Sequence, residues 1–149
     1  MNGAFGSGGE VGAGITYDDV TNVLTINVAW GIANGFTNLT GNATAGHIHG
    51  PTPASGVGSF TQNIGVLFGL DSGPTWNNSA SAGGVFGRTI TLTETQEGQL
   101  LAGRYYINVH TTTNAPGEIR GNLVVVPETS TSVLAAAALG LLTLRRRRV

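Results

Sequence analysis

The stretch Tyr105-Tyr106-Ile107-Asn108-Val109-His110-Thr111 is rich in aromatic and β-branched residues, which is typical of a strand in the core of a β-sheet protein. Side chains two positions apart share a face of a strand, so Tyr105, Ile107 and Val109 are expected on an apolar face. The alternate residues, including Asn108 and His110, are expected on a polar face. The stretch therefore predicts a strand with one side in the core and a histidine on the other side.

The segments on either side of this stretch also have clear signals. After it, Asn114-Ala115-Pro116-Gly117 predicts a turn that leads into a last strand, Glu118 to Val126. This last strand is expected to be adjacent and antiparallel to the strand of Tyr105–Thr111. Before it, Thr93 and Gln96 have the spacing of a helix capping box, and Gly103 is a plausible helix stop. About two turns of helix are expected there, the single helix of the domain.

The N-terminal half predicts further strands. Ile15–Tyr17 and Val23–Trp30 flank a five-residue turn and are expected to form a β-hairpin. Its core face is expected to hold alternate residues, namely Leu24, Ile26, Val28 and Trp30. Residues 54–84 are expected to be mostly loop, with Asn63–Phe68 the one strand in that region and Trp76 an aromatic lid over one end of the core.

Length and composition agree with an all-β domain. The chain has 149 residues, enough for one domain with a hydrophobic core, and its 24 glycines favour many short turns. It has no cysteine, which excludes disulfides, thiolate metal sites and a cysteine nucleophile. In residues 1–126, three arginines stand against seven acidic residues, a balance of −4 that argues against nucleic-acid binding.

The other two histidines of the chain lie in Ala45-Gly46-His47-Ile48-His49-Gly50-Pro51. Thr44 to His49 is expected to be a short strand that ends at Gly50-Pro51, because proline cannot donate to a sheet. His47 and His49 would then lie on one face. Three imidazoles on neighbouring strands, His47, His49 and His110, are a sufficient set of ligands for Zn²⁺ or Cu²⁺. In the alternative interpretation, the histidines donate hydrogen bonds to backbone carbonyls of the 50–84 loop.

The end of the chain has a different composition. Val126, Pro127 and Glu128 precede a short Ser-Thr spacer, the apolar run Val133 to Leu144, and the cluster Arg145, Arg146, Arg147 and Arg148. This order resembles the bacterial PEP-CTERM sorting signal, with Thr129 at the position where that signal usually has a second proline. The resemblance implies a hydrophobic membrane helix and cleavage by an exosortase-type protease in a Gram-negative bacterium. Because no signal peptide is visible in Met1–Gly14, the resemblance also implies a start upstream of Met1.

Residues 1–126 resemble a CHRD domain, named from chordin, through His47-Ile48-His49-Gly50-Pro51, Tyr105 to Thr111, and Pro116-Gly117-Glu118-Ile119-Arg120-Gly121. The resemblance implies an immunoglobulin-like β-sandwich or a related barrel-sandwich. The His-x-His pair also resembles one part of the copper-zinc superoxide dismutase site, but three histidines are too few for its two metals. The expected organisation is a CHRD domain at 1–126, with its N-terminus incomplete, and a sorting tail at 127–149.

Three functional interpretations follow from these patterns. The leading one is a non-enzymatic exported protein of the cell envelope or extracellular matrix. Its partners would be the sorting protease, exopolysaccharide or matrix proteins, and the membrane before cleavage. The alternative is a mononuclear copper or zinc protein or metalloenzyme using His47, His49 and His110. A third is an adhesion module with a broad binding surface. No serine-nucleophile elbow, phosphate loop or His-Glu-x-x-His motif is present.

Overall fold

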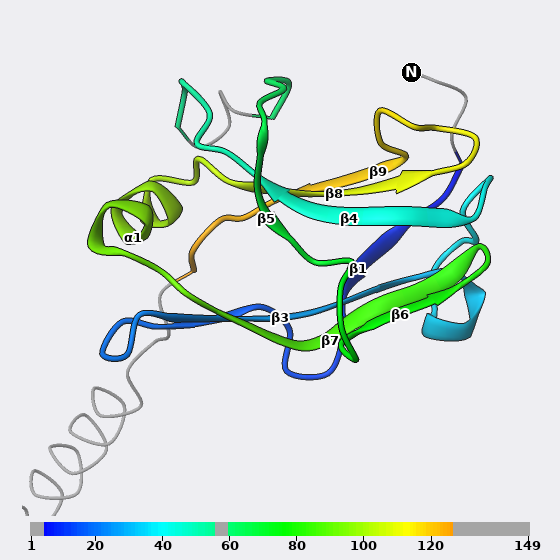
Figure 1. Cartoon of the computed structure of the whole chain (residues 1–149), viewed down its shortest axis with the longest axis horizontal. Coiled ribbons are helices and arrows are strands. Elements are labelled where there is room, and N and C mark those ends of the chain that lie inside the picture. Colours follow the sequence, from blue (N-terminus) through cyan, green and yellow to red (C-terminus); the bar gives the residue numbers. More distant parts are fainter. Residues whose placement is uncertain (1–4, 56–59, 127–149) are drawn as a thin grey trace, which may run out of the picture.

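The structure, a computed structural model, describes residues 5–55 and 60–126. In chain order its strands and helices are β1 (Gly8–Glu10), β2 (Thr16–Asp18), β3 (Val23–Trp30), the 3-10 helix η1 (Ile32–Asn34), β4 (Ala43–His49), β5 (Val66–Gly69), β6 (Trp76–Ser79), β7 (Ala82–Thr91), α1 (Glu94–Leu101), β8 (Tyr106–Thr111) and β9 (Ile119–Asn122). They form a β-sandwich of two antiparallel sheets (Figure 1), which confirms the predicted fold class.

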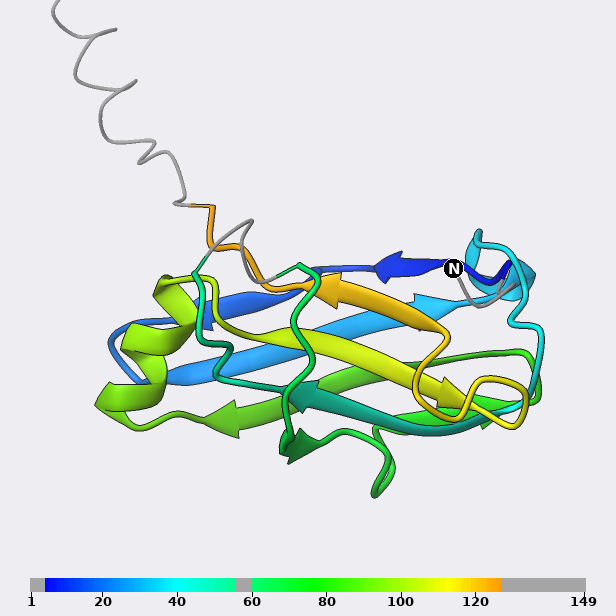
Figure 2. The same cartoon turned by 90° about the horizontal axis from the view of Figure 1, so that it is seen from above.

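The first sheet has the strand order β1-β3-β7-β6, with β2 also paired to β3, and the second has the order β5-β4-β8-β9. The hydrophobic core lies between the sheets and includes Leu24, Ile26, Ile48 and Ile107. The α1 helix covers one end of the sandwich, where Leu100 is buried (Figures 1 and 2). The capping box is confirmed, because the Gln96 amide donates to the Thr93 hydroxyl and the Thr93 amide donates to Gln96 Oε1.

The hairpin of β2 and β3 and the antiparallel pair of β8 and β9 are also confirmed. The last strand is shorter than predicted and ends at Asn122. Asn122 lies opposite Tyr106, the first residue of β8, so the chain beyond it has no further strand residue to pair with. Two other differences are the short β1 in the glycine-rich start and the shift of the predicted strand 63–68 to 66–69.

The expectation that 54–84 contains a single strand is wrong, because β6 also lies there and pairs with β7. The ring of Trp76 packs on that of Trp30, with centroids 5.2 Å apart. It also lies against β4 at Gly46, where a Cβ atom would be 2.6 Å from Trp76 Cζ3. The glycine therefore allows the strand that carries two histidines to lie directly on the tryptophan.

Among the described residues, no helix combines the length and apolar character needed to cross a bilayer. The predicted apolar helix Val133–Leu144 and the arginine cluster lie outside the described residues.

Candidate functional site

Alternation along two neighbouring strands places all three histidines on one face of a sheet. In β4, Ile48 is fully buried in the core, so His47 and His49 point to the opposite side of the sheet. In β8, Ile107 and Val109 lie in the core, and His110 points the same way as the β4 pair. The strands are antiparallel, with Ala45 opposite His110 and Asn108 opposite His47. The predicted polar face of the Tyr105–Thr111 strand is confirmed.

Two loops cover this outer face of the sheet, and Figure 1 shows both on the side that faces away from β3 and β7. The loop before β5 reaches His49, because the Ile64 carbonyl lies 2.8 Å from His49 Nδ1. The loop between β8 and β9 reaches His110, because the Ala115 carbonyl lies 2.8 Å from His110 Nδ1. As a result His49 is only 7% exposed, although it lies outside the hydrophobic core.

The remaining nitrogens of the rings converge. His47 Nδ1 lies 3.0 Å from His110 Nε2, and one ligand nitrogen from each of the three rings lies within 4.8 Å of the other two. His49 Nε2 is buried and has no hydrogen-bond partner among the residues that the structure describes. A metal bound at about 2.0–2.1 Å from each nitrogen needs the nitrogens somewhat more than 3 Å apart. The separation of 3.0 Å between His47 and His110 is slightly shorter than this spacing, and the limit of 4.8 Å for the three ligand atoms is longer.

The predicted hydrogen bond to the 50–84 loop is present at His49, whose Nδ1 atom contacts the Ile64 carbonyl. His110 instead contacts the Ala115 carbonyl in the β8–β9 loop, and its Nε2 atom faces His47 Nδ1. Histidines that bind metals have this arrangement, in which the second ring nitrogen is held by a carbonyl or carboxylate.

A carboxylate stands beside the third ring. Asp71 Oδ2 lies 3.9 Å from His47 Nε2, and both side chains are partly exposed. No sequence pattern marks Asp71 as a site residue, because it lies in a loop without periodicity. The pairing of β5 with β4, in which Gly69 lies opposite His47, brings it to the site.

Aromatic stacking supports His49 from the side. The rings of His49 and Tyr106 are 4.9 Å apart and nearly parallel, at 6°. The guanidinium carbon of Arg120 lies 3.5 Å from the centre of the Tyr106 ring. Arg120 also donates to the Gln62 carbonyl at 2.7 Å, so the same residue holds the loop and the stack.

The surroundings favour neutral imidazoles at His47 and His49. Burial lowers the pKa of His47, and the Asp71 carboxylate offsets this only in part, while His110 and His49 lower it further. Burial also lowers the pKa of His49, against the raising effect of its hydrogen bond to Ile64. A neutral imidazole is the form that binds a metal.

Glu118, the first residue of the predicted last strand, makes hydrogen bonds to other residues than the histidines. Its carboxylate accepts from the Thr40 amide at 2.6 Å and from the Thr111 hydroxyl at 2.8 Å. The Asn114 side-chain amide donates to it at 3.2 Å. Glu118 therefore fastens the β8–β9 loop to the segment before β4.

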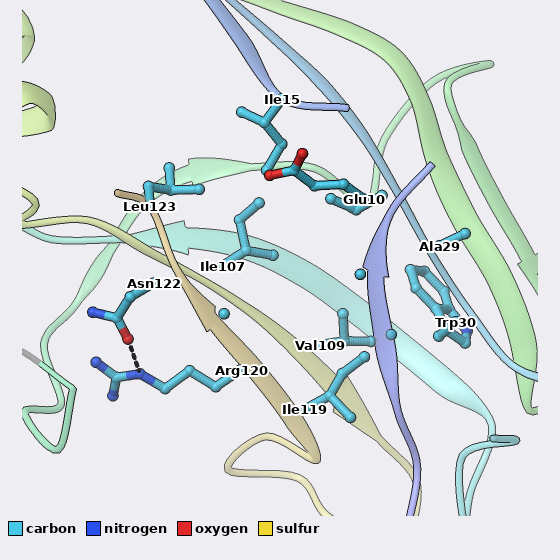
Figure 3. Close-up of a pocket in the computed structure, with 14 residues that line it drawn as sticks. Glu10, Ile15, Ala29, Trp30, Ile107, Val109, Ile119, Arg120, Asn122 and Leu123 are labelled. Carbon is cyan, nitrogen blue, oxygen red and sulfur yellow. Dashed lines mark hydrogen bonds between the residues drawn. The ribbon is translucent and has the colours of Figure 1, made fainter. Parts of the chain in front are cut away.

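A separate apolar cavity of about 220 Å³ lies on the other side of the same sheet, between β1 and β9 (Figure 3). Ile15, Val28, Ile107, Val109 and Ile119 are among the side chains that line it. None of the three histidines lines this cavity, so it is not part of the polar site.

The fold and the site define a two-sheet β-sandwich protein with a histidine cluster on the outer face of one sheet. Residues 3–123 match the model of the CHRD domain, and the chain belongs to the CHRD domain family. The match includes the N-terminal strands as well as the histidine motifs. No curated protein and no solved structure gives a significant match to the chain.

Proposed function

We propose that the CHRD domain of this chain binds one Cu²⁺ or Zn²⁺ ion through His47, His49 and His110. The observation that carries the proposal is the convergence of one ligand nitrogen from each of the three rings. The buried His49 Nε2 atom supports it, since it has no hydrogen-bond partner in residues 5–55 and 60–126. A buried polar atom without a hydrogen bond costs free energy that a bound metal would recover. Imidazole is a good ligand for both ions, and no thiolate is present to favour softer ones.

Calorimetric titration of Cu²⁺ and Zn²⁺ into the purified protein tests this function. The wild type is expected to bind one equivalent, and His49→Ala is expected to lose that binding. Asp19→Ala, which removes an exposed carboxylate from the turn before β3, is the control and is expected to bind like the wild type. Equal binding by the wild type and His49→Ala would contradict the proposal.

A second proposal concerns where the protein is sent in the cell, and it depends only on the sequence of residues 126–149. We propose that the chain is exported, sorted through Val126-Pro127-Glu128, the apolar run and Arg145–Arg148, and cleaved by an exosortase-type protease. Four features in a fixed order support it: the Pro-Glu pair, the spacer, the apolar segment and the terminal arginines. A positive cluster beside an apolar segment is typical of the cytoplasmic end of a membrane-inserted helix.

Expression in a host with and without its exosortase tests the sorting proposal. Mass spectrometry of the surface fraction is expected to find a new C-terminus near Pro127-Glu128 only in the host that has the protease. Replacement of Arg145–Arg148 by glutamine is expected to release uncleaved protein. An intact C-terminus in the surface fraction of both hosts would contradict the proposal. In this role exopolysaccharide or matrix proteins are the expected partners of the domain.

A further inference from the structure

The hydrogen bonds of the three rings define which nitrogen carries the hydrogen in each neutral imidazole. A carbonyl can only accept, so the Nδ1 atoms of His49 and His110 donate, to Ile64 and Ala115 respectively. The Nε2 atom of His110 then carries a lone pair and is an acceptor. His47 Nδ1, 3.0 Å away, must therefore be the donor in that contact.

This assignment has a consequence for metal binding. A metal that is bound by both His47 Nδ1 and His110 Nε2 needs a lone pair on each atom, but a single hydrogen lies between them. The metal must replace that hydrogen. His47 then becomes the other neutral tautomer, with its hydrogen on Nε2.

The atom that faces His47 Nε2 is Asp71 Oδ2, at 3.9 Å. When the His47 hydrogen is on Nδ1, the lone pair of His47 Nε2 faces a carboxylate oxygen of Asp71, and no hydrogen lies between the two atoms. In the other tautomer an N–H group faces a carboxylate, and an approach of about 1 Å makes a hydrogen bond. The backbone keeps Asp71 in place, because the neighbouring Leu70 amide donates to the Gly46 carbonyl in β4 at 2.8 Å.

We infer that Asp71 is the positioning residue of the metal site, the acceptor that holds His47 in the tautomer whose Nδ1 lone pair points at the metal. The inference rests on the proposed metal-binding function and adds the role of a residue that does not touch the ion. The step is balanced: the Nδ1 hydrogen leaves as a proton, Nε2 takes up a proton, and the His47 ring stays neutral. Carboxylate–histidine–metal arrangements of this kind orient the ring and make it a better ligand.

The first test observes the tautomers directly in the wild-type protein. Long-range ¹H–¹⁵N correlation spectra are recorded near pH 8, with the protein treated with a chelator and then loaded with Zn²⁺, which is diamagnetic. His49 and His110 are expected as Nδ1–H in both samples, and His47 is expected to change from Nδ1–H to Nε2–H on loading. A His47 ring that keeps its hydrogen on Nδ1 when zinc is bound would overturn the inference.

The second test measures the contribution of the carboxylate. Asp71→Ala is expected to bind Zn²⁺ about 10–100-fold more weakly than the wild type, the usual effect of losing such a partner. In the zinc-loaded wild type the His47 Nε2–H proton is expected to be shifted downfield and to exchange slowly with water, because it donates to the carboxylate. In zinc-loaded Asp71→Ala it is expected to lose both properties, which a merely structural role would not produce. Asp19→Ala makes the same change of charge on the other sheet and is expected to leave zinc affinity unchanged.

The outcomes separate this inference from the function on which it rests. If the wild type binds zinc, His49→Ala does not, and Asp71→Ala binds like the wild type, the role of Asp71 is wrong and the three-histidine site stands. If the wild type and His49→Ala bind equally, the metal site itself is wrong. Should Asp71→Ala not fold, the His47 Nε2–H proton of the zinc-loaded wild type still decides the inference. A downfield, slowly exchanging proton is expected, and the shift and fast exchange of an N–H group that faces water would overturn the inference.

Discussion

His47 Nδ1 lies 3.0 Å from His110 Nε2, although the two residues are 63 positions apart in the chain. The sheet register explains the contact. Ala45 is the residue directly opposite His110, so His47 reaches His110 diagonally across the small alanine side chain. A bulkier residue at position 45 would stand beside the two rings, whereas alanine leaves them free to meet.

Metal binding is expected to stabilise the domain. An ion that binds only the folded protein adds about 2.7 kcal/mol when its free concentration is 100 times the dissociation constant. Zn²⁺ should therefore raise the melting temperature of the wild type in differential scanning calorimetry, and a chelator should reverse the rise. His49→Ala should melt at the same temperature with and without zinc. A zinc-induced rise of equal size in this variant would argue for sites elsewhere.

Glu118 is expected to make stability depend on pH in the acid range. Burial alone would raise the pKa of this carboxyl, but hydrogen bonds from Thr40, Thr111 and Asn114 outweigh it and hold the pKa below its usual range. A lowered pKa in the folded state means that the ionised group stabilises the fold above the pKa of the unfolded chain. That contribution is lost as the pH falls through the folded-state pKa.

Denaturation at pH 6 and at about pH 3 checks the role of Glu118. The wild type is expected to be more stable than Glu118→Gln at pH 6. The difference should shrink towards pH 3, because the stabilisation is lost progressively as the pH falls from the unfolded-state pKa towards the lowered folded-state pKa. A difference that grows as the pH falls would have the wrong sign for a carboxylate stabilised in its ionised form.

A pair of Gly→Ala substitutions is expected to have opposite effects. Gly46→Ala places a methyl group 2.6 Å from Trp76 Cζ3, and the ring is held by Trp30, so a loss of about 1–3 kcal/mol is expected. Gly98 lies in the middle of α1, where a Cβ meets nothing within 4 Å. Gly98→Ala should gain about 0.5–1 kcal/mol. Urea denaturation of both variants measures whether the free energy of unfolding falls or rises in each. An increase in Gly46→Ala would contradict the described packing.

Tyr106→Phe is expected to loosen the loop over the histidines while keeping the stack on His49. The Tyr106 hydroxyl accepts from the Ile64 amide at 3.1 Å and donates to the Ile64 carbonyl at 3.3 Å. Its loss should cost about 1 kcal/mol of stability. Amide hydrogen exchange is expected to speed up in residues 62–65.

The control for that loop is Tyr17→Phe, which removes a hydroxyl that donates to Asn22 at 2.7 Å in the other sheet. Tyr17→Phe should leave exchange in residues 62–65 unchanged. Faster exchange there in both variants would indicate a general loss of stability rather than a local anchor.

The sequence predicts the regular parts of this structure well, for physical reasons that particular residues illustrate. The alternation of apolar and polar residues in Val23–Trp30 and Tyr105–Thr111 indicates which side chains are buried. The spacing of Thr93 and Gln96 indicates where a helix begins. The convergence of His47, His49 and His110 follows from the same alternation, once β4 and β8 are neighbours.

What the sequence could not predict depends on contacts between distant segments. Trp76 lies in a strand because β7 pairs with it, and its local sequence of glycine, proline and asparagine favours a loop. Asp71 reaches His47 through the pairing of β5 with β4. The carbonyls of Ile64 and Ala115 are backbone atoms that any residue supplies, so no side-chain pattern marks them as partners of the histidines.

The alternation of β4 and β8 assigns packing and ligand binding to different side chains. Ile48, Ile107 and Val109 hold the two sheets together, and the histidines between them face away from the core. The outer face can therefore lose its imidazoles, or exchange them for other side chains, while the sandwich keeps its core. In this chain, the imidazoles at positions 47, 49 and 110 can therefore be replaced without removing a side chain of the hydrophobic core.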